Sequence, residues 1–346
     1  MSFTWSISSP EAQGVNVEGL VRALSYLGSV AGHDGAREVV IIRNGQLIHQ
    51  GEAATRRHGI HSVTKVFTTT ALGLLIRQGK LELSTKAAEL YPALTEHYPH
   101  VELRHLAAMT SGYRAVGDEP RPDGYAHGTS FNFTKPHPKP LFVPGSSYAY
   151  WDSAYNLLAY LLTRSAGEPL QDLLQREVMT RLGISKADWS WGSYGRYGGA
   201  WLNSGSGNYD QHVTMNALNL AKLGLLYLNG GRLREEQLLP VAFVRDATRV
   251  QVSTDASLGQ PESGFDGRGC YGFGWWVQAQ RSGSSKWPGV PADTFAASGY
   301  NNNDMFILPK FNLVFVRTGL DQCDKAITDT QYGQFLSLLI QACGER

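Results

Sequence analysis

A serine and a lysine, Ser62 and Lys65, stand three positions apart at the start of a long uncharged stretch. On a helix, that spacing puts both side chains on one face of the same turn. A serine hydroxyl becomes a useful nucleophile when a neighbouring base removes its proton. A lysine can be that base if burial lowers its pKa. These residue types and this spacing therefore fit acyl transfer through an acylated serine.

The stretch that carries this pair, residues 61–79, predicts a helix buried in the middle of a large core. No charged residue lies between Lys65 and Arg77, and the second half is apolar nearly all round. Gly79 stands where a helix would stop. The stretch is too short to cross a membrane, which takes about 20 apolar residues. The positive dipole end and free N–H groups at its start would disfavour a charged ammonium and help to hold an oxyanion.

A structural interpretation of the same pair stays open. Ser-x-x-Lys is a short pattern that can occur by chance. Ser62 would then be a helix cap and Lys65 an ordinary residue of the first turn.

A second pair, Tyr150 and Asp152, lies just before another expected helix. A tyrosine at such a junction can project into a cleft and carry protons if nearby cations lower its pKa. It can equally be one of the 16 tyrosines that packs in the core. Asp152 can cap the helix that begins at Ser153, or it can face the cleft. Both interpretations stay open at this stage.

Composition favours an enzyme over a nucleic-acid-binding or membrane protein. The 346 residues exceed the usual size of one simple domain, and the formal net charge of +1 indicates neither nucleic acid nor an anionic membrane as a partner. The widely spaced Cys270, Cys323 and Cys343 fit neither a disulfide scaffold nor a zinc site, and we expect buried free thiols. The first residues lack a signal-peptide pattern, which predicts a cytoplasmic protein. We expect no metal or other cofactor.

The expected elements follow the order strands, helices, strands, helix. Two β-rich runs flank Asn44-Gly45, a strong hairpin signal. The other expected elements are a helix over 15–30, two helices within 153–182, a helix over 214–229, strands from about 270 (271–280, 293–299, 303–309 and 312–319) and a final helix over about 325–342.

This order predicts an α+β fold with one antiparallel sheet built from both chain ends. We expect a discontinuous sheet domain of residues 1–80 and 265–346, with a mainly helical domain of residues 81–264 inserted between its halves. The active cleft would lie between the two domains. The loops at 114–145 and 187–209 would shape it.

Four motifs, in this order, resemble the serine β-lactamase-related hydrolases. This family includes class C β-lactamases, D-alanyl-D-alanine peptidases, family VIII esterases and 6-aminohexanoate-dimer hydrolases. The resemblance covers roughly residues 10–340. The four motifs are SVTK at 62–65, LRHLAAMTSGY at 103–113, PGSSYAYWDSAYNLLAYLL at 144–162 and YGFGWW at 271–276.

The resemblance implies a β-lactamase/transpeptidase-like fold and a role for each matching residue. Ser62 would be the acylated nucleophile, Lys65 its proton acceptor, and Tyr150 the residue that passes the proton to the leaving group. The best match to the third family box is Ala297-Ser298-Gly299. The backbone N–H groups of Ser62 and Tyr300 would then form the oxyanion hole. Substrate contacts would come from Ser298, Gly299, Asp152 and Tyr113.

Two departures from the family pattern bear on the substrate. Ala297 stands where penicillin-recognising relatives carry a cation that helps to hold a carboxylate. Its absence argues against β-lactams and peptidoglycan stems. Asp152 stands where others have asparagine, and a carboxylate there could keep Lys65 charged or bind an amine of the substrate.

The sequence therefore predicts a serine hydrolase that cleaves a small ester or amide. One alternative is a β-lactamase or D-amino-acid peptidase, and another is a non-catalytic relative that only binds a ligand. GRGCYG at 267–272 fits a dinucleotide-binding pattern, but polar loop precedes it and a strand-like run follows it, so we reject that interpretation. The oligomeric state stays open.

Overall fold

A six-stranded antiparallel sheet forms the centre of the computed structural model, which describes residues 3–118, 128, 130–197, 199–259, 265–281, 284–321 and 325–344. The strand order is β12-β15-β16-β17-β1-β2, and every neighbouring pair is antiparallel. Its strands are β1 (Val39–Arg43), β2 (Gln46–Gln50), β12 (Trp276–Val277), β15 (Phe295–Gly299), β16 (Asn303–Leu308) and β17 (Leu313–Arg317). Both ends of the chain contribute strands, which confirms the predicted α+β fold.

The predicted hairpin at Asn44-Gly45 is confirmed. Both residues have a positive φ, 51° and 75°, as the tight turns that match the twist of paired strands require. The turn joins β1 to β2, and β1 pairs with β17 on its other side. The N-terminal hairpin is thereby tied to the C-terminal strands.

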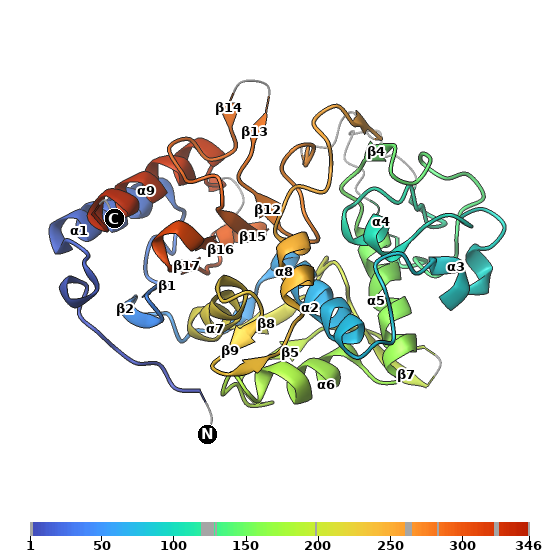
Figure 1. Ribbon diagram of the computed structural model, residues 1–346, viewed down its shortest axis with the longest axis horizontal. Helices are drawn as coiled ribbons and strands as arrows, with labels where there is room; N and C mark the ends of the chain where they lie inside the picture. Colours follow the sequence, from blue (N-terminus) through green and yellow to red (C-terminus); the bar gives the residue numbers. More distant parts are fainter. Residues whose placement is uncertain are drawn as a thin grey trace.

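Helices cover the sheet on both faces (Figure 1). On one face α1 (Val17–Val30) lies beside α9 (Asp329–Ala342), so closely that a Cβ at Gly19 would come within 2.8 Å of the Ala342 side chain. On the other face α7 (Ala217–Leu228) packs through Gly224 against Val314 and Met305. The expected start of α9 at about 325 is too early, because a capping box of Thr328 and Gln331 begins the helix at Asp329.

The remaining helices gather on the far side of α7 (Figure 1). They are α2 (Thr64–Arg77), α3 (Ala87–Leu90), α4 (Leu103–Ala107), α5 (Asp152–Ala166), α6 (Leu170–Leu174) and α8 (Val241–Ala247). The second helix expected within 153–182 is divided, since α6 passes into a π-helical turn at Gln175–Met179. The predicted division into two domains stays a prediction. Helix α7, which belongs to the 81–264 segment, packs on the sheet.

Other short strands lie outside the main sheet. They are β3 (His58–Gly59), β4 (Ser147–Tyr148), β5 (Ser190–Trp191), β6 (Ser193–Tyr197), β7 (Ala200–Asn203), β8 (Val213–Met215), β9 (Arg232–Leu233), β10 (Glu236–Gln237), β11 (Ser257–Leu258), β13 (Gln280–Arg281) and β14 (Ser284–Ser285). The strand predicted over 271–280 is too long, and that part of the prediction is wrong. The chain turns at Gly274, with φ 75°, and only Trp276–Val277 joins the sheet.

Helix α2 is buried as predicted. Every residue from Thr64 to Leu75 is buried, and the chain leaves the helix at Gly79 with a positive φ of 67°. The hydroxyl groups of its threonines form hydrogen bonds inside the core. For example, the Thr69 hydroxyl donates to the carbonyl oxygen of Phe273 at 2.9 Å. A helix surrounded in this way is a rigid support for the residues at its start.

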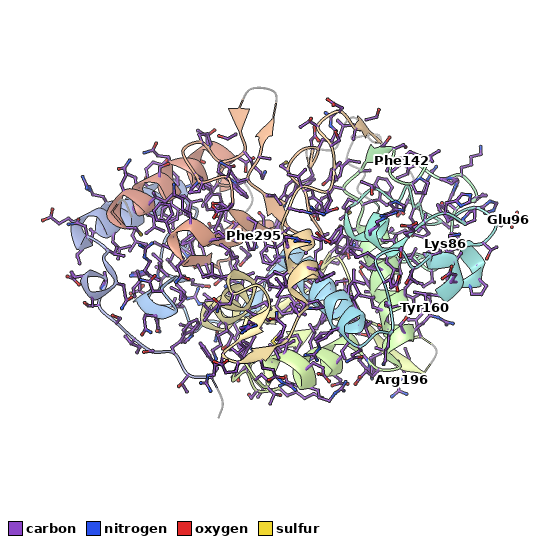
Figure 2. All side chains as sticks on the ribbon, viewed as in Figure 1. Lys86, Glu96, Phe142, Tyr160, Arg196 and Phe295 are labelled. Carbon is purple, nitrogen blue, oxygen red and sulfur yellow. The ribbon has the colours of Figure 1, made fainter. Side chains whose placement is uncertain are left out.

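Two hydrophobic cores lie on the two faces of the sheet. Figure 2 shows Phe295 of β15 among packed interior side chains, while Glu96 lies at the periphery. Cys270 and Cys343 are buried free thiols, as expected, and Cys323 lies outside the described residues. In the part of the chain that the structure describes, no helix is long and apolar enough to cross a membrane.

Candidate active site

Ser62 lies on a 3-10 turn, His61–Val63, that leads directly into α2. The residue before it, His61, has a positive φ of 46°, a conformation that costs a non-glycine residue about 1–3 kcal/mol and often marks a functional site. The N-cap position of α2 is Val63, so Ser62 does not cap the helix. Its Oγ lies 3.2 Å from Nζ of Lys65. The predicted pair therefore meets within hydrogen-bond distance.

Lys65 is buried, with 1% of its surface exposed, among acceptors. Its Nζ lies 2.8 Å from Oδ1 of Asp152, 2.9 Å from the carbonyl oxygen of Ser206 and 4.6 Å from the ring centre of Tyr150. Burial pulls the pKa of Lys65 down, but the Asp152 carboxylate and the Tyr150 hydroxyl outweigh it and raise that pKa above its ordinary value. Lys65 is therefore an ammonium at neutral pH in this arrangement.

Tyr150 and Asp152 approach this ammonium from the start of α5. The Tyr150 ring is buried and lies parallel to Trp276 of β12, with an angle of 8° between the planes. Asp152 is the first residue of α5, and Trp151 holds the N-cap position. The cleft interpretation of Asp152 fits this geometry, and the cap does not.

The end of β15 closes the site against the serine turn. A Cβ at Gly299 would lie 2.4 Å from the carbonyl oxygen of Ile60 and 3.2 Å from the backbone nitrogen of Ser62. Only glycine fits so close an approach of two backbones. The neighbouring Ser298 lines the same cavity, and the ring of Tyr300 contacts His61 at 5.2 Å between centres.

Two residues singled out by the sequence lie away from the cavity lining. Ala297 is fully buried in the core between the sheet and the helices. Tyr113 is 1% exposed, packs on Tyr98 and donates its hydroxyl to the carbonyl of Phe133 at 2.5 Å. The geometry therefore gives no support to the expected contact of Tyr113 with substrate.

Asn156 is a residue that sequence reasoning did not assign. Its Oδ1 accepts hydrogen bonds at 3.0 Å from the backbone N–H groups of Gly205 and Ser206. The loop held in this way presents the Ser206 carbonyl to Lys65. Asn156 stands inside the recognised PGSSYAYWDSAYNLL motif, so the motif offered a signal, but its partner lies 50 residues further along the chain.

These residues line one cavity of about 950 Å³. Ser62, Tyr150, Asp152, Ser298 and Gly299 all contribute to its wall. Burial, together with His212 and His58, lowers the pKa of His61 on the same wall to about 4, so this imidazole is neutral at physiological pH. The hydroxyls of Ser62 and Tyr150 therefore belong to residues that line one cavity, and the buried Lys65 ammonium lies 3.2 Å from the Ser62 hydroxyl.

Comparison with known proteins identifies the family of this chain. The profile of the Beta-lactamase family matches residues 20–318, so the chain belongs to that family. A β-lactamase of Pseudomonas fluorescens is 32% identical over 126 residues, which cover 36% of this chain. The alignment spans about a third, 34%, of that relative's own length.

Solved structures share the fold at low sequence identity. A putative 6-aminohexanoate-dimer hydrolase from Bacillus anthracis superposes with a TM-score of 0.66 at 16% identity, covering 99% of this chain and 87% of that one. A family VIII carboxylesterase superposes with a TM-score of 0.67 at 14% identity, covering 95% and 99%. These similarities establish the β-lactamase/transpeptidase-like fold that the motifs predicted.

Proposed function

We propose that this protein hydrolyses a small ester or amide through an acyl-enzyme on Ser62. The observation that carries the proposal is the 3.2 Å contact between Ser62 Oγ and Lys65 Nζ, where Ser62 lines the cavity. The fold shared with a family VIII carboxylesterase supports the reaction class.

The proposed first step forms one bond and breaks another. Ser62 Oγ attacks the carbonyl carbon of the substrate, and its proton passes to the Lys65–Tyr150 pair. The tetrahedral oxyanion would lie at the backbone N–H groups of Ser62 and Tyr300, beside Gly299. The tetrahedral intermediate then collapses, and Tyr150 delivers the proton to the departing alcohol or amine. Water attacks the ester of Ser62 in the second half-reaction and releases the acid.

The Asp152 carboxylate sets a condition on this mechanism. Since it keeps Lys65 charged, Lys65 accepts a proton only in the fraction of molecules that have lost the one it holds. We therefore expect the rate to rise with pH.

The ester or amide preference rests on Ala297. A buried methyl group replaces the cation that would help to bind the carboxylate of a β-lactam or a D-amino-acid peptide. Rapid hydrolysis of a cephalosporin would contradict this preference.

The test compares p-nitrophenyl butanoate hydrolysis by the wild type and by Ser62→Ala. We expect turnover in the wild type and none above background in the variant. Ser84→Ala, which removes an exposed serine far from the cavity lining, is the matched control and should keep full activity. Retained activity in Ser62→Ala would refute the proposed nucleophile.

The rival function is ligand binding without catalysis, and the Lys65–Asp152 pair favours it because a permanently charged lysine is a poor base. A serine-reactive fluorophosphonate distinguishes the two functions. An active acyl-transfer site would label Ser62, as peptide mass spectrometry would show. A non-catalytic relative would leave it unlabelled.

A further inference from the structure

The cavity that contains Ser62 continues along β15 and β16 to the start of α9. Its wall there includes Ser298, Asp304 and Tyr332. Ser298 and Asp304 face each other as a cross-strand pair, and Tyr332 projects from α9. This part of the cavity is therefore built by the sheet and the C-terminal helix, away from the proton-transfer residues on α2 and α5.

Asp304 is a carboxylate with 2% of its surface exposed, and hydroxyl groups are its hydrogen-bond donors. Tyr332 donates to Oδ2 at 2.5 Å, and Ser298 donates from the neighbouring strand. Burial raises the pKa of Asp304 to about 6, while these hydroxyls and Arg317 act in the opposite direction. The carboxylate is therefore still ionised at neutral pH.

The nearby Arg317 is engaged elsewhere. Its guanidinium forms a fully buried ion pair with Asp321 and donates to the carbonyl of Asn302 at 2.9 Å. Among the described residues, no cationic side chain forms an ion pair with Asp304 within 4.0 Å. The negative charge of Asp304 is thus less compensated than its burial would demand.

The cavity wall as a whole is acidic. Its charged side chains among the described lining residues are Asp152, Asp210, Asp266, Asp304, Asp329 and Lys286. Three of the acids have a cationic neighbour: Asp152 has Lys65, Asp266 has Arg268 at 2.8 Å, and Asp329 has Lys286 at 2.9 Å. Buried Asp304 is the carboxylate whose charge most needs a counter-ion.

Aromatic rings lead to this carboxylate. The ring centres of Trp287 and Phe306 are 5.0 Å apart, and those of Phe306 and Tyr332 are 4.8 Å apart. All three residues line the cavity. Aromatic faces attract cations, and a desolvated carboxylate attracts them more strongly. This environment fits an organic cation better than an anion or a neutral polar group.

We propose that the cavity selects substrates that carry an ammonium group, which Asp304 binds with help from Ser298 and the neighbouring aromatic rings. This inference rests on the proposed hydrolase function and assigns Asp304 as the residue that determines specificity. The ammonium would donate to Asp304 and supply the missing counter-charge.

The test uses ester pairs that differ only in charge. Two amines, the p-nitrophenyl esters of 3-aminopropanoic acid and of 4-(aminomethyl)benzoic acid, are compared with their neutral counterparts, the butanoate and the 4-ethylbenzoate. For at least one pair we expect the wild type to favour the amine at least tenfold in kcat/KM. In Asp304→Asn that preference should fall to about one. Asp255→Asn, an exposed carboxylate away from the cavity, is the charge-matched control.

Two results would overturn the inference. One is equal kcat/KM for the amine and its neutral counterpart in the wild type for both pairs. The other is a preference that survives in Asp304→Asn. If Asp304 has only a structural role, the variant would leave the selectivity for amines unchanged, whatever its effect on thermal stability.

A binding measurement separates failure of this inference from failure of the proposed function. Calorimetric titration with benzylamine, and with benzyl alcohol as the neutral control, needs no turnover. We expect benzylamine to bind the wild type and Ser62→Ala equally and to bind Asp304→Asn at least tenfold more weakly. Binding without any ester hydrolysis would refute only the catalytic proposal. Hydrolysis without a preference for amines would refute only the role of Asp304.

Discussion

Two carboxylates on one cavity wall, Asp152 and Asp304, are both nearly inaccessible to solvent, yet their surroundings differ. Asp152 lies 2.8 Å from the Lys65 ammonium, so its charge is compensated inside the protein. Asp304 has hydroxyl donors from Tyr332 and Ser298. A buried ion pair is an internal device that can control a proton, whereas a buried carboxylate without a cation is suited to bind one from outside. The comparison separates the chemistry of the site from its specificity.

Breaking the Lys65–Asp152 pair should have the largest effect. Lys65→Met leaves a buried, uncompensated carboxylate, and we expect a loss of about 3–5 kcal/mol in the free energy of unfolding together with the loss of esterase activity. The double variant Lys65→Met/Asp152→Asn should recover most of that stability but no activity. Urea denaturation and p-nitrophenyl butanoate assays measure the two effects. A single variant as stable as the wild type would show that the pair is not desolvated.

Closing the oxyanion hole is the next largest effect expected. In Gly299→Ala, the new methyl group would lie 2.4 Å from the Ile60 carbonyl and would push β15 away from the Ser62 N–H. Loss of an oxyanion donor typically costs about 10²–10³-fold in kcat. Gly28→Ala, at a site with open space around it and without a positive φ, is a control for adding a methyl group to a glycine. Unchanged kcat in Gly299→Ala would exclude this part of β15 from the proposed oxyanion hole.

Neutralising Asp152 should move the pH profile. The carboxylate raises the pKa of Lys65, and the proposed active form is the neutral amine. In Asp152→Asn that pKa falls, so the rise of kcat/KM with pH should shift to lower pH, and activity at pH 7 should increase severalfold. Stopped assays across pH 6–10 on both proteins test this. A profile that stays in place would mean that Lys65 is not the group that accepts the proton.

The last expected effect concerns the pH dependence of stability, which Asp304 should influence. The folded-state pKa of about 6 lies above the ordinary value of 3.8, so the folded protein binds this proton more tightly than the unfolded chain. The ionised form therefore costs stability above about pH 6, by up to about 3 kcal/mol. Asp304→Asn should melt at a higher temperature than the wild type at pH 8. That advantage should shrink as the pH falls through 6 and vanish near pH 4.

A melting curve for Asp304→Asn below that of the wild type at pH 8 would contradict this sign. The stability cost is itself informative. A carboxylate that destabilises the folded protein at neutral pH and lies on a cavity wall is more easily explained by ligand binding than by structure.

The sequence determined the local parts of this molecule. A two-residue hairpin turn needs a positive φ at both of its central residues, and Asn and Gly adopt this conformation readily. Asn44-Gly45 between two β-rich runs therefore predicted the hairpin. The uncharged stretch after Lys65 has few alternatives to a buried helix. Ser62 and Lys65 meet because three positions on a helical turn bring them together. Each of these follows from neighbours in the chain.

Only the tertiary structure decided which residues distant in the sequence contact one another at the site. Asp152 could cap its own helix or face the cleft, and long-range packing of α2 against α5 placed its carboxylate on Lys65. Ala297 and Ser298 are successive residues of one strand, so they point to opposite faces, and only the packing of the sheet decided which face meets the cavity. Asp304 carries no local signal, since its proposed role depends on the position of β16 beside β15 and on the contact with Tyr332 of α9.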